Sequence, residues 1–120
     1  MLTRSQKFAK LVYERVSAHG DRSKDEKDKY GAMAQKLPVL VRTAGLAQAI
    51  AFLEAKSKSK GGEMNGHLLK DLSGVLGLSS EEFVRKCREV ELIGYLRLTQ
   101  DVLAALLWFK RFSVSVLEDK

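Results

Sequence analysis

The spacing of apolar side chains predicts helix along almost the whole chain. Near the N-terminus, Phe8, Leu11, Val12 and Val16 recur at intervals of three and four residues, as in an amphipathic helix. No stretch alternates convincingly between apolar and polar residues, so we expect no strand. The same period, together with the positions of proline, glycine and capping residues, predicts helices over residues 4–18, 24–37, 38–44, 46–56, 65–76, 80–90 and 91–116.

Three segments have the sequence of a capping box. In this motif a hydroxyl accepts a hydrogen bond from a free backbone N–H at a helix start, and a later side chain bonds back. The segments are Thr3–Gln6, Ser23–Glu26 and Ser79–Glu82. Each precedes a segment with helical spacing, so we expect three helices to begin there.

Proline and glycine set the predicted breaks. Pro38 disfavours helical backbone at the residue before it and is favourable at the first position of a new helix, so we expect an interruption there. Gly45 is a natural left-handed helix cap. The stretch 56–63 alternates lysine with serine before two glycines, which predicts a flexible lysine-rich loop.

The last predicted helix has more apolar surface than one core-facing stripe needs. Trp108 and Phe112 lie near the border opposite its main apolar side. The helix is either a central one wrapped by the others, or one that presents an aromatic edge to a partner protein. On a helical wheel the main apolar side contains Leu92, Leu96, Leu103, Leu106, Leu107 and Leu117, widened by Val102 and Phe109.

These elements predict an all-α fold over residues 1–120: a single compact helical bundle of about five to seven helices with a long C-terminal helix. A length of 120 residues suits one domain. The 45% of hydrophobic and 30% of charged residues are typical of a soluble globular protein. No apolar run approaches the roughly 20 residues that span a bilayer. With no signal peptide evident, we expect a cytoplasmic protein without a membrane partner.

The charge is positive and uneven. The net charge is +6, and residues 1–60 contain 13 Lys and Arg against 6 Asp and Glu, whereas residues 61–120 contain 8 against 9. Such an asymmetry favours a basic face that attracts a polyanion, although it indicates attraction and not specificity.

The sequence offers little for a metal or nucleophilic site. Cys87, His19 and His67 are far apart in sequence, whereas zinc sites use four ligands at short paired spacings, so we expect no metal and no cofactor. Cys87 is the single cysteine and cannot form an internal disulfide, which fits a reducing compartment. With no histidine near it in sequence, it is expected to be a small buried hydrophobe and not a nucleophile.

A cluster of acids around the start of the second helix admits two interpretations. With His19, the acids could hold a metal ion for phosphodiester cleavage. They also fit a helix start, where acids complement the helix dipole and pair with interleaved Arg and Lys. This interpretation explains the same residues without a metal ion. The cluster consists of Asp21, Asp25, Glu26 and Asp28.

Residues 72–88 resemble a helix-turn-helix, the DNA-binding motif. An apolar helix, a glycine turn and a capped second helix follow one another. The second helix begins with Glu81 and Glu82, which would repel the phosphates that such a helix start contacts. A DNA-binding protein that uses this segment, with Ser80, Arg85 and Arg88 as its contacts, is the alternative function.

Four stretches, in this order and spacing, resemble the small helical subunit of the type III-B CRISPR effector, the Cmr complex. They are Lys36–Arg42, Gly45–Phe52, Tyr95–Thr99 and Trp108–Phe112, and the opening Thr3–Gln6 is also similar. The resemblance implies a non-catalytic, antiviral RNA-silencing subunit whose copies stack along guide RNA and target RNA. Its partners would be the backbone and large subunits and copies of itself, with target cleavage belonging to a backbone subunit.

The basic residues within the family-like stretches are the candidate RNA contacts: Lys36, Arg42, Arg97, Lys110 and Arg111. Lys56, Lys58 and Lys60 rank lower because they lie outside these stretches. A solvated or ion-paired position within the bundle is the alternative for each. Lys110 is predicted to project from the apolar side of the last helix, where it needs an anion: RNA phosphate, or Glu54 or Glu89. Trp108 and Phe112 are candidates for a protein contact.

Overall fold

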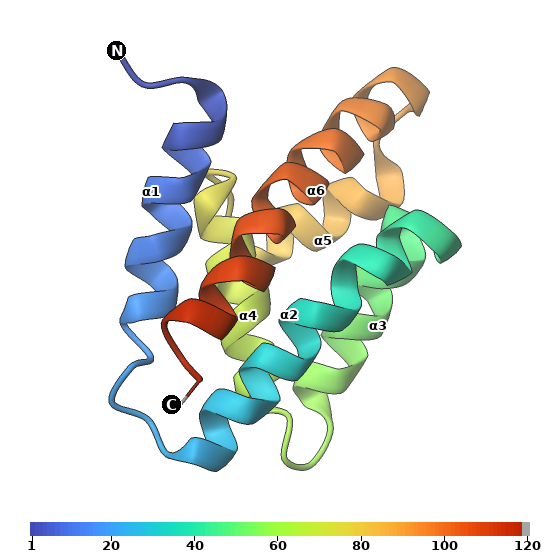
Figure 1. Ribbon diagram of the computed structural model, residues 1–120. Coiled ribbons are helices and arrows are strands. Elements are labelled where there is room, and N and C mark those ends of the chain that lie inside the picture. The colour runs from blue at the N-terminus through green and yellow to red at the C-terminus, as the bar shows by residue number, and fades with distance from the viewer. Residues whose placement is uncertain (119–120) are drawn as a thin grey trace.

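The computed structural model describes residues 1–118, which form six helices and no strand (Figure 1). The predicted all-α fold with a long C-terminal helix is therefore confirmed. The helices are α1 (Arg4–Ser17), α2 (Lys24–Ala44), α3 (Leu46–Lys58), α4 (Glu63–Val75), α5 (Ser80–Glu89) and α6 (Leu92–Ser115).

The predicted capping boxes mark three helix starts correctly. At α1, Thr3 Oγ1 accepts a hydrogen bond from the Gln6 N–H at 3.1 Å, and Gln6 Oε1 accepts one from the Thr3 N–H at 2.8 Å. The box at the start of α2 is complete in the same way. Before α5 only half forms, because Ser79 Oγ accepts from the Glu82 N–H while the Glu82 carboxylate bonds to the Ser79 hydroxyl instead of its backbone.

The expected interruption at Pro38 is wrong, because α2 continues through it from Lys24 to Ala44. Proline removes one backbone hydrogen bond from a helix interior and costs about 3 kcal/mol. Leu37 and Val41, on either side of it, are 0% and 3% exposed. Full burial of such a side chain contributes about 1.5–3 kcal/mol, so core packing on both sides of the proline offsets the lost bond.

The lysine-rich loop is shorter than the predicted 56–63. Helix α3 runs to Lys58 and α4 starts at Glu63, which leaves residues 59–62 as the turn. The serine hydroxyls here bond to carbonyls of the helix, from Ser57 to Glu54 at 2.6 Å and from Ser59 to Lys56 at 2.7 Å. They support the last turn of α3 where composition alone indicated flexibility.

Helix α6 crosses one side of the bundle and packs against α1 and α2 (Figure 1). It has only a few contacts with α4 and α5, and much of its outer side is exposed, so of the two interpretations the helix wrapped by the others is wrong. The face of α6 that packs against α1 and α2 is rotated away from the predicted leucine side. As a result, Leu92, Leu96 and Leu107 are exposed. The buried face consists of Val102, Ala105, Leu106, Phe109 and Ser113.

Helix α6 is also, within the described part of the chain, the one helix long and apolar enough to cross a membrane, with a mean hydropathy of 1.3 over its most apolar window. The expectation that no segment has this length and composition is therefore corrected. Phe109 and Leu106 of this helix are fully buried in the core, and Asp101 forms an ion pair with Arg4 of α1. Packing in the bundle accounts for only part of its apolar character, because 22% of this window is buried.

The start of α3 is capped by a side chain from α6. Gly45, at φ 92°, separates α2 from α3 and supplies no side chain of its own. The Tyr95 hydroxyl accepts a hydrogen bond from the Ala47 N–H at 3.1 Å. A Cβ at Gly45 would lie 3.3 Å from this hydroxyl oxygen, so glycine serves both the backbone conformation and the close approach.

We expect Tyr95→Phe to lower the free energy of unfolding by about 1 kcal/mol, because a backbone N–H at the start of α3 loses its cap. Urea unfolding followed by circular dichroism measures the change. Tyr13→Phe is the matched control, since Tyr13 is exposed and its ring edge packs on Phe112. Equal losses for both variants would contradict the capping role of Tyr95.

Candidate nucleic-acid interface

Lys36 and Lys56 approach each other across one aromatic ring. Their ammonium nitrogens lie 5.7 and 5.5 Å from the centre of the Phe52 ring, in cation–π contact. Because α3 extends past Lys56, this lower-ranked lysine is held on a helix beside α2. The two lysines line a hollow of about 240 Å³ together with Lys29, Ala32, Met33 and Asn65.

A second pair of candidate cations lies on α6. Lys110 and Arg111 line an open hollow of about 660 Å³, and the Arg111 guanidinium lies 5.9 Å from the centre of the Trp108 ring. Lys110 is exposed, as is Leu107 three residues before it on the predicted apolar side, so Lys110 does not require a buried anion. Glu54, one suggested partner, lies 3.8 Å from Lys58 instead. The remaining lining residues are Gln35, Leu107, Phe112, Val114 and Ser115.

A third hollow, of about 280 Å³, joins these two across α2. It shares Ala32 with the hollow at Lys36 and Gln35 with the hollow at Lys110. We call the surface formed by the three hollows the α2 face. Its acidic side chains are Asp28 and Glu118, and its basic ones are Lys27, Lys29, Lys36, Lys56, Lys110 and Arg111.

The other predicted cations are more dispersed. Arg42 is exposed and follows Gln35 by seven residues, so it lies two turns further along the same side of α2. Arg97 lines a separate hollow at the start of α6 with Lys86 and Asp101. Lys58 faces Glu54, and Lys60 is exposed in the turn before α4.

Residues 72–88 form the end of α4, a turn at Gly77 and helix α5, so the two helices of the alternative motif are present. The exposed first turn of α5 presents Glu81 and Glu82, the groups that would repel DNA phosphates. Cys87, on the buried side of α5, is 3% exposed, and burial raises its pKa to about 12. This confirms the interpretation of Cys87 as a buried hydrophobe, since a nucleophile needs a lowered pKa.

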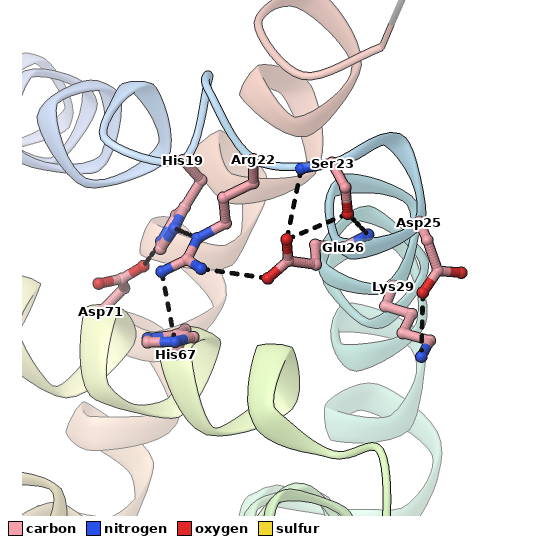
Figure 2. A network of polar contacts seen from close by, with 8 residues as sticks. All are labelled: His19, Arg22, Ser23, Asp25, Glu26, Lys29, His67 and Asp71. Carbon is pink, nitrogen blue, oxygen red and sulfur yellow. Dashed lines mark hydrogen bonds and ion pairs between the residues drawn. The ribbon is translucent and has the colours of Figure 1, made fainter.

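Two hydrogen-bonding groups and one arginine converge on Asp71 inside the bundle, and Figure 2 shows the contact from His19. His19 Nε2 lies 2.8 Å from Asp71 Oδ2, and the Tyr30 hydroxyl donates to the same oxygen at 2.7 Å. Arg15 lies 3.7 Å from the other carboxylate oxygen. Burial, followed by the charge of Asp71, raises the pKa of Tyr30 well above its usual range. This network ties α1, α2 and α4 together.

Arg22 links the two histidines at the edge of this network (Figure 2). Its Nε donates to His19 Nδ1 at 2.8 Å, which places the His19 proton on Nε2, facing Asp71. Its Nη2 lies 3.3 Å from His67 Nε2. Burial, followed by the charge of Arg22, lowers the pKa of His67. The two histidines, distant in sequence, are thus neighbours held by an arginine.

The acidic cluster at the start of α2 is used in ion pairs one turn apart. Arg22 pairs with Glu26 at 3.2 Å, and hydrogen bonds from Ser23, followed by Arg22, lower the pKa of Glu26. This confirms the interpretation of the acids as a helix start. Within residues 1–118 no group of three or more His, Cys, Asp or Glu is arranged to hold a metal ion. The other pairs are Lys24 with Asp28 at 2.8 Å and Lys29 with Asp25 at 3.2 Å.

Comparison with known proteins places this helical bundle among the CRISPR-associated proteins. The pattern that defines the CRISPR-associated protein family Cas_Cmr5 matches residues 4–116. The chain is 47% identical over 121 residues to the CRISPR system Cmr subunit Cmr5 of Thermus thermophilus, and the alignment covers 99% of this chain and 100% of the relative. The chain therefore belongs to the Cmr5 family, which confirms the resemblance inferred from its sequence.

A solved structure agrees with this assignment. The X-ray crystal structure of a CRISPR-associated Cmr5 family protein from Thermus thermophilus superposes with a TM-score of 0.87 at 45% sequence identity. The match covers 98% of this chain and 100% of that one. The helical bundle thus has the fold of that Cmr5 family protein.

Proposed function

We propose that this chain is a non-catalytic small subunit of a CRISPR RNA-guided RNA-silencing complex that holds guide and target RNA by phosphate contacts on the α2 face. Family membership supports the subunit role, because the Thermus relative is named as a Cmr subunit. The observation on which the RNA contact rests is the α2 face itself, where Lys36 and Lys56 line one hollow and Lys110 and Arg111 line another.

This arrangement suits binding without sequence discrimination. Lysine and arginine attract phosphates at any sequence, and in an RNA-guided complex base pairing between guide and target supplies the specificity. Lys36 and Lys56 are exposed and lie over a ring, so their charges are available to a phosphate. The two cations are therefore the first candidates for backbone contacts, with Lys110 and Arg111 next along the face.

The proposed partners are guide RNA, target RNA, the backbone and large subunits, and further copies of this chain in a cytoplasmic assembly. Leu92 and Ile93, at the start of α6, are each 71% exposed. Apolar side chains this exposed are typical of protein contacts, which supports the proposal that companion subunits cover this end of the molecule.

The double variant Lys36→Ala/Lys56→Ala tests the RNA contact. Each phosphate contact contributes about 0.7–0.9 to the slope of log affinity against log salt, so losing both is expected to reduce the slope by about 1.4–1.8. Retention of target RNA by the reconstituted complex, titrated with salt, measures it.

The matched control is Lys7→Ala/Lys10→Ala, which removes two exposed lysines of α1 that line none of the three hollows. Circular dichroism checks that both variants fold. An unchanged salt slope in the Lys36 and Lys56 variant would show that these lysines are solvated surface charges. It would contradict the proposal that the α2 face contacts RNA.

A further inference from the structure

The largest hollow of the α2 face has an aromatic floor. The rings of Trp108 and Phe112 are stacked, with centroids 5.5 Å apart and planes at 23°. Tyr13 of α1 packs edge-on against Phe112 at 5.4 Å, which fixes the position of that ring. Leu107 and Val114, both nearly half exposed, complete the apolar part of the lining. The Trp108 ring is partly exposed at this surface.

The polar part of the same hollow is cationic. Lys110 and Arg111 are exposed, and Arg111 lies over the Trp108 ring. Gln35 of α2 donates a hydrogen bond to the Lys110 carbonyl at 2.9 Å, which joins the hollow to α2. No carboxylate is among the described residues that line it. An occupant should therefore have a flat apolar part and a neighbouring negative charge.

We propose that an unpaired base of single-stranded RNA stacks on Trp108 in this hollow. Arg111, which lies over that ring, gives up its place to the base and binds a flanking phosphate together with Lys110. Proteins that bind single strands combine a basic groove for the backbone with aromatic rings for the bases. Gln35 also lines the middle hollow of the α2 face, which contains Asp28 and Glu118 beside Lys27, so the base contact is assigned to the Trp108 hollow alone. The inference rests on the proposed function and adds a base contact to it.

Charge favours this occupant over a protein side chain. The apolar lining alone would accept either a leucine of a neighbour or a base. A base arrives with a phosphate on each side, which matches two adjacent cations and an absence of carboxylates among the described lining residues. Trp108 and Phe112, predicted as a protein contact, are thereby assigned to RNA.

The test uses the fluorescence of Trp108, the single tryptophan of the chain. A short fluorescein-labelled single-stranded RNA is compared with a strand of equal length and charge in which every base is missing. Both are titrated into the full chain at low salt, about 50 mM, where phosphate contacts are strongest. Fluorescein anisotropy reports binding and tryptophan quenching reports stacking.

We expect the RNA to quench Trp108 saturably and the abasic strand to bind without quenching. Loss of one stacked base should weaken binding by roughly 5- to 150-fold, so the abasic strand and the variant Trp108→Leu should both show a loss of this size. Circular dichroism checks the fold of Trp108→Leu.

A second variant keeps the tryptophan. Leu107→Glu places a carboxylate at the edge of the hollow on a side chain that is 47% exposed, so the fold should persist while quenching is lost. Leu11→Glu on α1, from a similarly exposed leucine at 41%, is its control and should quench normally.

Three results would overturn the inference. If both strands bind equally and neither quenches Trp108, the phosphate contacts are supported and the stacking of a base on Trp108 is refuted. An absence of binding by either strand would also refute the site, while the Lys36 and Lys56 retention experiment separately decides the proposed function. A tryptophan change that appears only on adding companion subunits, without RNA, would assign the hollow to a protein.

Discussion

Replacing Asp71 by alanine is expected to lower the free energy of unfolding by about 3–5 kcal/mol, which is most of the stability of a marginal domain. Tyr30 is fully buried and His19 is 6% exposed, and both bond to Asp71 Oδ2. Without the carboxylate, the phenol and the imidazole N–H remain in the core with no acceptor. The penalty for such unpaired groups exceeds the energy of the bonds themselves.

Urea unfolding followed by circular dichroism measures this loss. Asp21→Ala removes an exposed acid near the same helix start and is expected to change stability by less than about 0.5 kcal/mol. Tyr30→Phe, which deletes one donor and keeps the ring, should cost about 1 kcal/mol. A loss for Asp71→Ala no larger than that for Asp21→Ala would show that the network contributes nothing to folding.

The second large effect is expected at Gly62, where alanine should lower the free energy of unfolding by about 1–3 kcal/mol. A Cβ there would collide with the Lys56 carbonyl oxygen at the end of α3. This atom belongs to the backbone and also accepts the Ser59 hydroxyl, so it cannot move aside as a flexible side chain would. The turn between α3 and α4 must therefore distort.

Gly66→Ala gives a control of opposite sign. Gly66 lies inside α4, and a Cβ there would be 3.6 Å from the Ser57 Cβ, an ordinary contact. Alanine is favoured over glycine within helices by about 0.5–1 kcal/mol, so this variant should be more stable than the wild type. Thermal unfolding of the two variants compares them directly. A loss of stability in both, or a gain in both, would contradict the assigned geometry.

Helix starts were predictable from sequence because their causes are local. A hydroxyl and a carboxylate or amide three residues apart suffice for the boxes at Thr3 and Ser23. The continuity at Pro38 was not predictable, because it depends on the burial of Leu37 and Val41 when other helices pack against α2. Local preference and tertiary packing opposed each other there, and packing prevailed.

The buried network was invisible in the sequence for a related reason. His19 and Asp71 are 52 positions apart, and no spacing rule connects them. The candidate cations, in contrast, were found by charge and by the family resemblance, while their grouping was not. Lys36 and Lys56 come together only because α2 and α3 lie side by side, and Lys56 was expected in a loop.

The α2 face draws its charges from positions 27–36, 56 and 110–111 of the chain. A peptide copied from any one helix would hold at most part of this set. Affinity for a polyanion should accordingly weaken when the bundle melts and recover when it refolds. An isolated α2 peptide should bind more weakly than the folded chain. The α2 face exists only in the folded chain. Core substitutions that lower the stability of the bundle should therefore also weaken the function of the surface.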